Sequence, residues 1–286
     1  MARLDRRNHT RYCWHRQFPG LSLLQADFTA HDYPAHAHDA FVIAVTEQGG
    51  ARIRSRRIEE AVGPATLFVS NPAEPQSATM GDSPHWRYRA LYLTRQATDV
   101  VARDLGWRDV PCFTRNMLGD RDLIAGFAQL HHALVDGADS LREHELLIAV
   151  FAELFRRHGS GGGRLEPAPR DRTRADKVIE VMRSRYRESL RLDELAAVAG
   201  LTSFQLLGLF RRTVGLTPHA YLIKTRLAVA CRYLRRGYPL AESALAAGFC
   251  DQSALTRHFK RWYGITPLQF AEAARSARPR RPDGRR

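Results

Sequence analysis

The feature that most restricts the fold of this chain is a pattern that occurs twice near its C-terminal end. Residues 210–221 return as residues 259–270, at an offset of 49 positions. Both copies contain a Phe, a basic pair, a Gly, a Leu or Ile, a Thr-Pro dipeptide and a closing aromatic residue, all in register. An internal repeat indicates a duplicated supersecondary unit. The C-terminal part of the chain is therefore predicted to contain two similar modules.

The first module is predicted to be a short helix, a tight turn and a second helix. Apolar residues recur with helical spacing over 192–199, and Gly200 follows where the turn requires a positive φ. The second helix is predicted over 203–214, with Thr202 or Ser203 as its N-cap. Two helices joined by a short glycine turn form a helix-turn-helix, whose second helix enters the major groove of DNA.

The second module repeats this scheme and is joined to the first by a long helix. Residues 241–247, the Gly248 turn and a helix over 251–263 with Asp251 as its N-cap correspond to the first copy. The connecting helix is predicted from about Pro218 to Arg236, because proline is well tolerated in a first helical turn. Such a helix is about 28 Å long, which places the two second helices near one turn of B-DNA apart, about 34 Å.

The distribution of charge indicates a nucleic-acid partner for this half. Residues 1–169 contain 20 Lys or Arg and 20 Asp or Glu, which leaves 24 basic and 10 acidic residues for residues 170–286. The whole net charge of +14 therefore belongs to the half that carries the repeat. A basic domain beside a neutral one is typical of proteins that bind the phosphate backbone. An arginine-rich composition without a partner is the alternative, but it would raise the charge of both halves.

With these motifs, residues 174–275 resemble the DNA-binding domain of the AraC/XylS family of bacterial transcription regulators. The matching positions are Leu195-Ala196, Gly200, Leu206, Phe210, Gly215-Leu216-Thr217-Pro218, Tyr221, Arg226-Leu227, Ala230, Leu234, Gly248-Phe249, Asp251-Gln252-Ser253, Arg257-His258-Phe259-Lys260 and Gly264-Ile265-Thr266-Pro267. Three positions depart from the family pattern. Gly208 stands where Arg is usual, Ser243 replaces an aliphatic residue, and Ala254 replaces a larger polar or aromatic one.

The exposed face of each second helix is expected to contact DNA. The expected contact residues of the first module are Phe204, Gln205, Gly208, Arg211 and Arg212. Those of the second module are Gln252, Ser253, Thr256, Arg257, Lys260 and Arg261. Gln can pair with adenine and Arg with guanine. Because the first set is poor in hydrogen-bonding groups, we expect the second module to read sequence more strictly.

Residues 1–158 have the texture of a β-rich domain followed by helices. Short β-type segments divided by Gly, Pro and Asn indicate a sandwich or jelly-roll barrel: 21–28, 40–46, 51–58, 66–70 and 86–93. Residues 1–20 are polar and basic and are expected to be an arm or disordered. Residues 120–158 have helical apolar spacing and are predicted to form a helical pair. The histidines of this pair are interpreted as ordinary surface residues: His131, His132, His144 and His158.

The β-rich segment resembles the cupin-like sensor domain of the same family in residues 34–39, 48–49, 63–64, 67 and 71–75. The resemblance implies an α+β protein: a cupin-like jelly-roll barrel with a helical pair, then an all-α domain of two helix-turn-helix units joined by a long helix. It also implies that residues 1–158 sense an effector and form a dimer through the helical pair. Two helices that merely pack on the barrel are the alternative.

His36 and His38 suggest a metal site, because metal-binding cupins begin with such a pair. A metal needs three or four ligands, but Glu47 is nine residues downstream and Gln76 stands where another His is expected. We therefore predict no metal and no cofactor, and expect contact with an effector or a structural role at the barrel mouth. The residues expected to line an effector pocket are Tyr33, His36, His38, Phe41, Trp86 and Tyr88. Strand aromatics of this kind also occur in ordinary cores.

The remaining segments are predicted to connect the domains and to end the chain. Residues 159–173 are rich in Gly and Pro and are predicted to be a flexible linker, and residues 276–286 a disordered basic tail. The four cysteines have no paired spacing, which favours a reduced cytoplasmic protein. No apolar run has the length of a membrane span or of a signal-peptide core, so no membrane partner is expected.

The sequence thus predicts a transcription regulator that binds double-stranded DNA, responds to a small-molecule effector, forms a homodimer and contacts RNA polymerase. Activation is the more common output of the family. No catalytic residue is expected, because the chain contains no GxGxxG, Walker, HExxH or GxSxG pattern. One alternative is a cupin-type metalloenzyme with an accessory DNA-binding module. Another is a ligand-independent architectural DNA binder, which would show little sequence preference.

Overall fold

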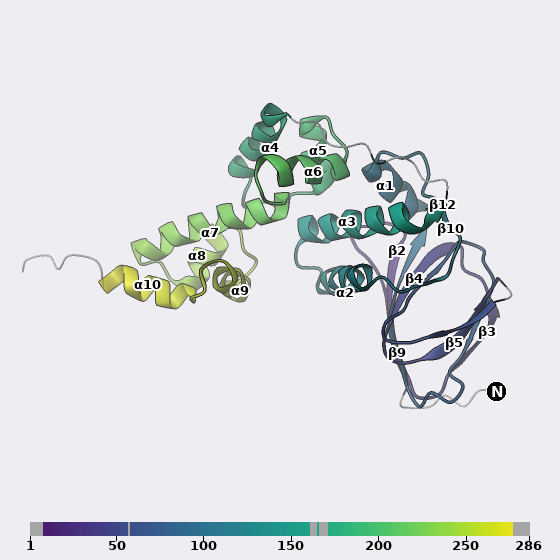
Figure 1. The fold of residues 1–286 in the computed structure, drawn as a ribbon. Helices are drawn as coiled ribbons and strands as arrows, with labels where there is room; N and C mark the ends of the chain where they lie inside the picture. The colour runs from purple at the N-terminus through teal and green to yellow at the C-terminus, as the bar shows by residue number, and fades with distance from the viewer. Residues whose placement is uncertain (1–7, 57, 161–164, 166–170, 277–286) are drawn as a thin grey trace, which may run out of the picture. The chain divides into compact units, whose positions relative to one another are not determined.

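The computed structural model describes residues 8–56, 58–160, 165 and 171–276 (Figure 1). The chain forms two compact units, Met1–Ala168 with Leu201–Gln205, and Pro169–Gly200 with Leu206–Arg286. Among the described residues, the first unit contains two large antiparallel sheets, a two-stranded ladder and three complete helices, and the second unit is helical.

The larger sheet of the first unit has the strand order β1-β2-β9-β4-β7-β11. These strands are β1 His9–Trp14, β2 Leu21–Phe28, β9 Trp86–Thr94, β4 Ala40–Gly49, β7 Leu67–Ser70 and β11 Met117–Leu118. All neighbours are antiparallel, and the central pair runs from Ala40 opposite Thr94 to Gly49 opposite Trp86. The register of this pair shifts between Thr46 and Gln48, as at a β-bulge.

The smaller sheet has the order β3-β8-β5-β6 and faces the larger one. Its strands are β3 Asp32–His36, β8 Gln76–Thr79, β5 Ala51–Ser55 and β6 Ile58–Val62. Buried side chains from both sheets form one apolar cluster that includes Leu24, Ala26, Phe28, Val42, Ala51, Ile53, Val62, Ala78 and Trp86. This is the predicted cupin-like jelly-roll barrel, because alternate residues of each strand point into a shared interior.

Three helices cover the outer face of the larger sheet: α1 Arg95–Leu105, α2 Arg121–Asp136 and α3 Ser140–His158. α2 packs on β4, β9 and α3, and α1 packs on β9 and α3 (Figure 1). The predicted pair over 120–158 corresponds to α2 and α3, whereas α1 was not predicted. A short two-stranded ladder joins β10, Cys112–Phe113, to β12, Gly159–Ser160.

The strands that sequence patterns predict are confirmed most closely where apolar residues are dense. Residues 21–28 coincide with β2, but residues 51–58 are not one strand, because the chain reverses near Arg56, whose φ is +50°. The polar segment 1–20, expected to be an arm or disordered, contains β1, which pairs with β2 along its length. β3 and β8 were missed because few of their residues are apolar.

Two histidines predicted to be on the surface are buried. His131 on α2 has no exposed surface and His144 on α3 has 1%. The Nε2–H of His131 donates to the carbonyl oxygen of Leu24 at 3.3 Å, and His144 Nε2 lies 2.7 Å from the Asp104 carboxylate. Burial is tolerated because each imidazole has a polar partner, which sequence spacing does not reveal.

The second unit contains the predicted pair of helix-turn-helix modules. Its helices are α4 Arg172–Ser184, α5 Leu192–Ala199, α6 Ser203–Thr213 from Leu206 onward, α7 Pro218–Arg236, α8 Leu240–Ala246, α9 Gln252–Tyr263 and α10 Pro267–Ser276. α7 has the predicted bounds, and the side chain of Thr217 caps it by accepting from the Ala220 N–H. Both turn glycines have positive φ, +61° at Gly200 and +85° at Gly248.

A loop between α4 and α5 connects the two modules. Arg226 on α7 donates to the carbonyl oxygens of Tyr186 at 2.7 Å and Glu188 at 2.9 Å. Arg187 in the same loop donates to the carbonyl oxygen of Ala246, at the end of α8, at 3.0 Å. The loop that leads into the first module is therefore held to the connecting helix and to the second module by hydrogen bonds from arginine side chains to main-chain carbonyl oxygens.

The predicted linker and tail lie largely outside the described residues. Of residues 159–173, the structure describes 159–160 in β12, residue 165, and 171–173 at the start of α4, whose N-cap is Asp171. Of residues 276–286 it describes Ser276, the last residue of α10.

Among the described residues, no single helix is both long and apolar enough to cross a membrane. The pair Leu192–Ala199 and Ser203–Thr213, which bends by 75°, reaches the required length and composition only when the two helices are taken together.

We predict that Gly248→Ala destabilises the protein more than Gly264→Ala. Both glycines have positive φ, +85° and +74°, so each substitution costs about 1–2 kcal/mol of backbone strain. At Gly248 a Cβ would also lie 2.9 Å from Arg187 Cα and from the Tyr186 carbonyl oxygen, whereas at Gly264 no atom lies within 4 Å. Overpacking adds roughly 1–3 kcal/mol. Calorimetry of both full-length variants measures this difference, and equal losses would contradict the close approach.

We also predict that His131 makes the first unit less stable in acid. Burial, and then the charge of Arg89, lower the pKa of His131 from 6.5 to about 4. The unfolded chain therefore binds more protons than the folded one between pH 6.5 and 4, and the free energy of unfolding falls by about 3 kcal/mol as the pH drops through this window. Denaturant titrations across these pH values should show a shallower slope for His131→Gln. His132→Gln, at the exposed neighbouring position, should change the slope much less, because the charge of His132 is the smallest of the causes that lower the pKa of His131.

Candidate functional site

The second helix of the second module, α9, buries one face and exposes the other. Ala254, Leu255 and Phe259 are buried in the core. The six side chains predicted to contact DNA form a stripe on the other face, exposed except for the half-buried Thr256: Gln252, Ser253, Thr256, Arg257, Lys260 and Arg261. Asp251 fixes the start of the helix, because its carboxylate accepts the Ala254 N–H at 2.7 Å.

The cations of this stripe are not neutralised by neighbours that the structure describes. Within residues 8–56, 58–160, 165 and 171–276, no carboxylate lies within ion-pair distance of Arg257, Lys260 or Arg261. By contrast, Arg157 of the first unit contacts both Asp120 and Asp122. The positive charge on α9 is therefore available to an external anion.

The second helix of the first module, α6, presents fewer free donors. The Oε1 of Gln205 accepts the Thr202 N–H at 3.1 Å, and Thr202 Oγ1 accepts the Gln205 N–H at 3.2 Å. This capping box identifies Thr202 as the N-cap and occupies the amide oxygen of Gln205. Phe204 and Gly208 are half-buried, while Arg211 and Arg212 are exposed at the end of the helix.

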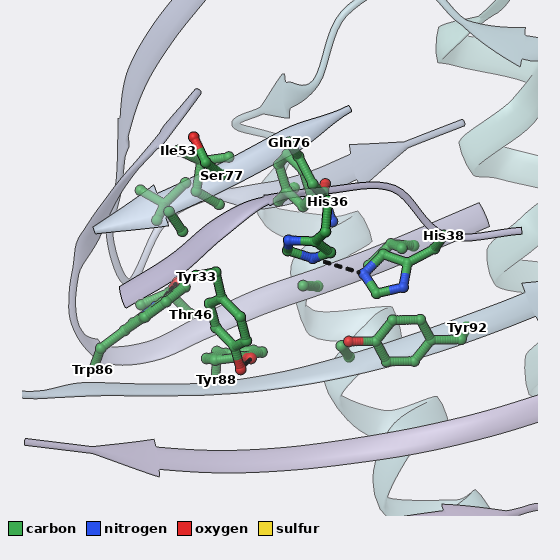
Figure 2. A pocket seen from close by; sticks show the side chains of 16 residues that line it. Tyr33, His36, His38, Thr46, Ile53, Gln76, Ser77, Trp86, Tyr88 and Tyr92 are labelled. Carbon is green, nitrogen blue, oxygen red and sulfur yellow. Dashed lines mark hydrogen bonds between the residues drawn. The ribbon is translucent and has the colours of Figure 1, made fainter. Parts of the chain in front are cut away.

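A second candidate site is a cavity inside the barrel, with a volume of about 80 Å³ (Figure 2). The residues that line it are Tyr33, His36, His38, Val42, Ala44, Thr46, Ile53, Val62, Phe68, Gln76, Ser77, Ala78, Trp86, Tyr88, Ala90 and Tyr92. β9 contributes the alternate residues 86, 88, 90 and 92, because successive side chains of a strand point to opposite faces. The cavity thus lies between the two sheets.

Most polar groups of the cavity are paired with one another. The hydroxyls of Tyr33 and Tyr88 are 2.7 Å apart, and Trp86 Nε1–H donates to Thr46 Oγ1 at 3.2 Å. His36 Nε2 and His38 Nε2 are 3.1 Å apart, as the dashed line in Figure 2 marks.

The tyrosines and His38 of the cavity are uncharged near pH 7. Burial raises the pKa of Tyr33, Tyr88 and Tyr92 above 10, so all three remain protonated. Burial, and then the charge of His36, lower the pKa of His38. No Lys, Arg, Asp or Glu lines the cavity.

The cavity brings together five of the six residues predicted to line an effector pocket: Tyr33, His36, His38, Trp86 and Tyr88. The sixth, Phe41, packs instead against Phe113 and Phe155, with ring centroids 5.7 and 6.0 Å away. Sequence reasoning missed Tyr92 and Gln76. The alternation of side chains along the strand from Trp86 could have identified Tyr92. Gln76 was considered only as the residue that replaces a metal-ligating His, not as part of the lining.

The donor set of the cavity does not fit a metal centre. His36 and His38 provide two nitrogens, while a bound metal in proteins usually has at least three protein ligands. Among the residues that the structure describes, no group of three or more His, Cys, Asp or Glu side chains could hold a metal ion.

Comparison with known proteins identifies both units. Residues 18–151 match the model of the AraC-like ligand binding domain, and residues 195–273 match that of the helix-turn-helix domain. The HTH-type transcriptional regulator YbfI of Bacillus subtilis (strain 168) is 28% identical over 222 residues, which cover 77% of this chain and 80% of YbfI.

Two solved structures are also similar. The DNA-binding domain of AdpA, in complex with a target DNA, is 30% identical, with coverage of 38% of this chain and 97% of that one and a TM-score of 0.35. Wild-type ToxT from Vibrio cholerae strain SCE256, bound to an unsaturated fatty acid, is 11% identical, with coverage of 88% and 95% and a TM-score of 0.36.

A ligand-binding type of barrel followed by a duplicated helix-turn-helix defines a DNA-binding transcription regulator. The chain belongs to the AraC/XylS family of these regulators.

We predict that Gln205→Ala loosens the start of α6, because the Thr202 N–H loses its acceptor. Loss of one neutral hydrogen bond costs about 0.5–1.5 kcal/mol. Hydrogen exchange at the Thr202 amide should therefore accelerate roughly three- to tenfold. Gln205→Glu keeps a carboxylate oxygen at the same place and should preserve the slow exchange. Equal exchange in Gln205→Ala and the parent protein would show that the cap is not formed in solution.

Proposed function

We propose that α9 and α6 bind successive major-groove segments of double-stranded DNA, and that α9 supplies most of the sequence discrimination. The stripe of exposed, unneutralised donors on α9 is the observation that carries this proposal. Arg257 can pair bidentately with guanine and Gln252 with adenine, each worth about 1–3 kcal/mol. On α6, Gln205 serves the cap and Gly208 has no side chain, so fewer groups can read base edges.

The other predicted residues of both helices are assigned supporting contacts. Lys260, Arg261, Arg211 and Arg212 lie toward the ends of α9 and α6 and are proposed to contact phosphates. Four such contacts would give the logarithm of the binding constant a slope of roughly −3.6 against the logarithm of the salt concentration. Ser253 and Thr256 are proposed to position α9, and Phe204 to contact a thymine methyl group.

We further propose that the barrel cavity binds a small-molecule effector that changes DNA occupancy. The match to the AraC-like ligand binding domain and the cavity between the sheets support this role. In this proposal residues 1–158 sense the effector, residues 159–173 link the domains and residues 174–275 bind DNA. α2 and α3 form a homodimer interface, the DNA-bound protein contacts RNA polymerase as an activator, and the protein acts in the cytoplasm.

The relatives favour regulation over catalysis. YbfI is a transcriptional regulator, and both domain models describe binding functions. A metalloenzyme would need ligands that the cavity lining does not provide. We therefore propose no enzymatic activity.

The test compares Arg257→Ala with Lys260→Ala on a site selected from random duplexes. Arg257→Ala should lower affinity for the selected site by roughly 5- to 150-fold and relax the base preference at one position. Lys260→Ala should weaken binding to all duplexes similarly and reduce the salt slope by about 1. Quantitative binding to a library of site variants, at several salt concentrations, measures both effects.

Gln205→Ala serves as the matched variant on α6. It should change affinity for the selected site but leave the base preferences nearly intact. A loss of specificity larger than that of Arg257→Ala would overturn the assignment of α9 as the main reader. A full-length protein that prefers no duplex over random competitor would overturn the proposed mode of DNA recognition.

A further inference from the structure

One polar atom of the barrel cavity has no partner. Gln76 is 9% exposed and lines the cavity, and its Oε1 is buried without a hydrogen bond among the residues that the structure describes. A buried acceptor without a partner costs about 1–3 kcal/mol. Gln76 lies on β8 directly opposite His36 on β3, so its unpaired Oε1 lies beside the histidine pair. The cavity therefore contains an acceptor that a ligand could satisfy.

The histidine pair offers a second acceptor. His36 Nδ1 is 2.7 Å from the carbonyl oxygen of Pro34, which can only accept, so this nitrogen carries the proton. In the neutral ring the Nε2 of His36 is then bare and accepts the Nε2–H of His38 at 3.1 Å. The Nδ1 of neutral His38 is therefore also a bare acceptor. The lowered pKa of His38 is consistent with this neutral form.

The remaining lining excludes several ligand classes. No charged side chain except the histidines faces the cavity, so a permanent anion or cation would be buried without a counter-charge. A polyol would need many polar partners, but the hydroxyls of Tyr33, Tyr88 and Thr46 are already engaged with neighbours. The volume of about 80 Å³ exceeds the roughly 10–15 Å³ that one water needs, and suits one small ring.

The aromatic walls favour a flat apolar body. Trp86 and Tyr88 stack with ring centroids 4.5 Å apart, and Tyr33 meets Trp86 edge-on at 6.2 Å. Figure 2 shows these rings at one end of the cavity and the histidines at the other. A ligand that spans this distance would have an apolar ring at the aromatic end and a polar group at the histidine end.

We infer that the barrel cavity selects a small, uncharged aromatic molecule with a hydroxyl group, which donates its hydrogen bond to Gln76 Oε1. This inference rests on the proposed effector function of the same cavity, and it adds the chemical class of the ligand and the residue that selects it. His38 Nδ1 accepts from a second donor where the ligand has one.

The test uses phenol, toluene, benzoate and benzylamine as probes of the full-length protein. Toluene has the shape of phenol without the donor, while benzoate and benzylamine carry opposite charges. Ligand-detected and protein-detected NMR titrations should show phenol binding about three- to tenfold more tightly than toluene, as expected for one neutral hydrogen bond. Benzoate and benzylamine should bind more weakly than phenol.

Gln76→Leu removes the acceptor at nearly constant volume and should abolish the preference for phenol over toluene. Gln48→Leu, at an exposed position of β4, should keep it. If Gln76→Leu does not fold, the ranking of the four probes on the parent protein still decides. Tighter binding of either charged probe, or equal binding of phenol and toluene, would overturn the inference while leaving the effector site intact. Failure of every probe to perturb cavity residues would refute both the inference and the proposed effector site.

Discussion

The DNA-binding unit depends on the attachment of one loop to the helix that joins its two modules. Arg226 binds the carbonyl oxygens of Tyr186 and Glu188, and the α8–α9 turn approaches the same loop so closely that position 248 admits only glycine. Hydrogen bonds from a charged donor are stronger than neutral ones, at about 1.5–3 kcal/mol. Because these contacts join α4–α5 to α7 and α8, the two reading helices cannot reorient independently. The relative placement of the two modules is then a property of the fold and not of a flexible connection.

Ion pairing distinguishes cations of the first unit from the α9 cations that are proposed to contact DNA. Arg56 and Arg157 in the first unit are surrounded by carboxylates and carbonyl oxygens, and the Arg56 guanidinium, with other donors, holds the pKa of the Glu74 carboxyl at about 2. Arg257 and Lys260 have no such partners in the described part of the chain. The cations of α9 thus differ from Arg172, Arg174, Arg185 and Arg191 of the same half, which pair with carboxylates, and they are available to an external anion.

The sequence anticipates this unit closely because its helices are specified locally. Thr217 caps α7 and Asp251 caps α9, and both helices begin where the sequence predicts them. The turn glycines Gly200 and Gly248 have the positive φ that a helix-turn-helix turn requires. The barrel was less predictable, since strand register depends on partners far away in the chain. Phe41 lies one residue from the cavity-lining Val42 and therefore points to the opposite face, which only the pairing of β4 with β9 settles. The place of Gln76 in the cavity lining became apparent only from the pairing of β8 with β3, which puts Gln76 opposite His36.

Strand β9 links the two faces of the sensor barrel. Tyr88 and Tyr92 point into the cavity, whereas the intervening Arg89 points outward, where its guanidinium lies 3.5 Å from His131 Nδ1 on α2. A strand is stiff along its length because its ladder of hydrogen bonds to β2 and β4 fixes both edges. The part-buried contact between Arg89 and His131 thus joins the strand that lines the cavity to the helical pair.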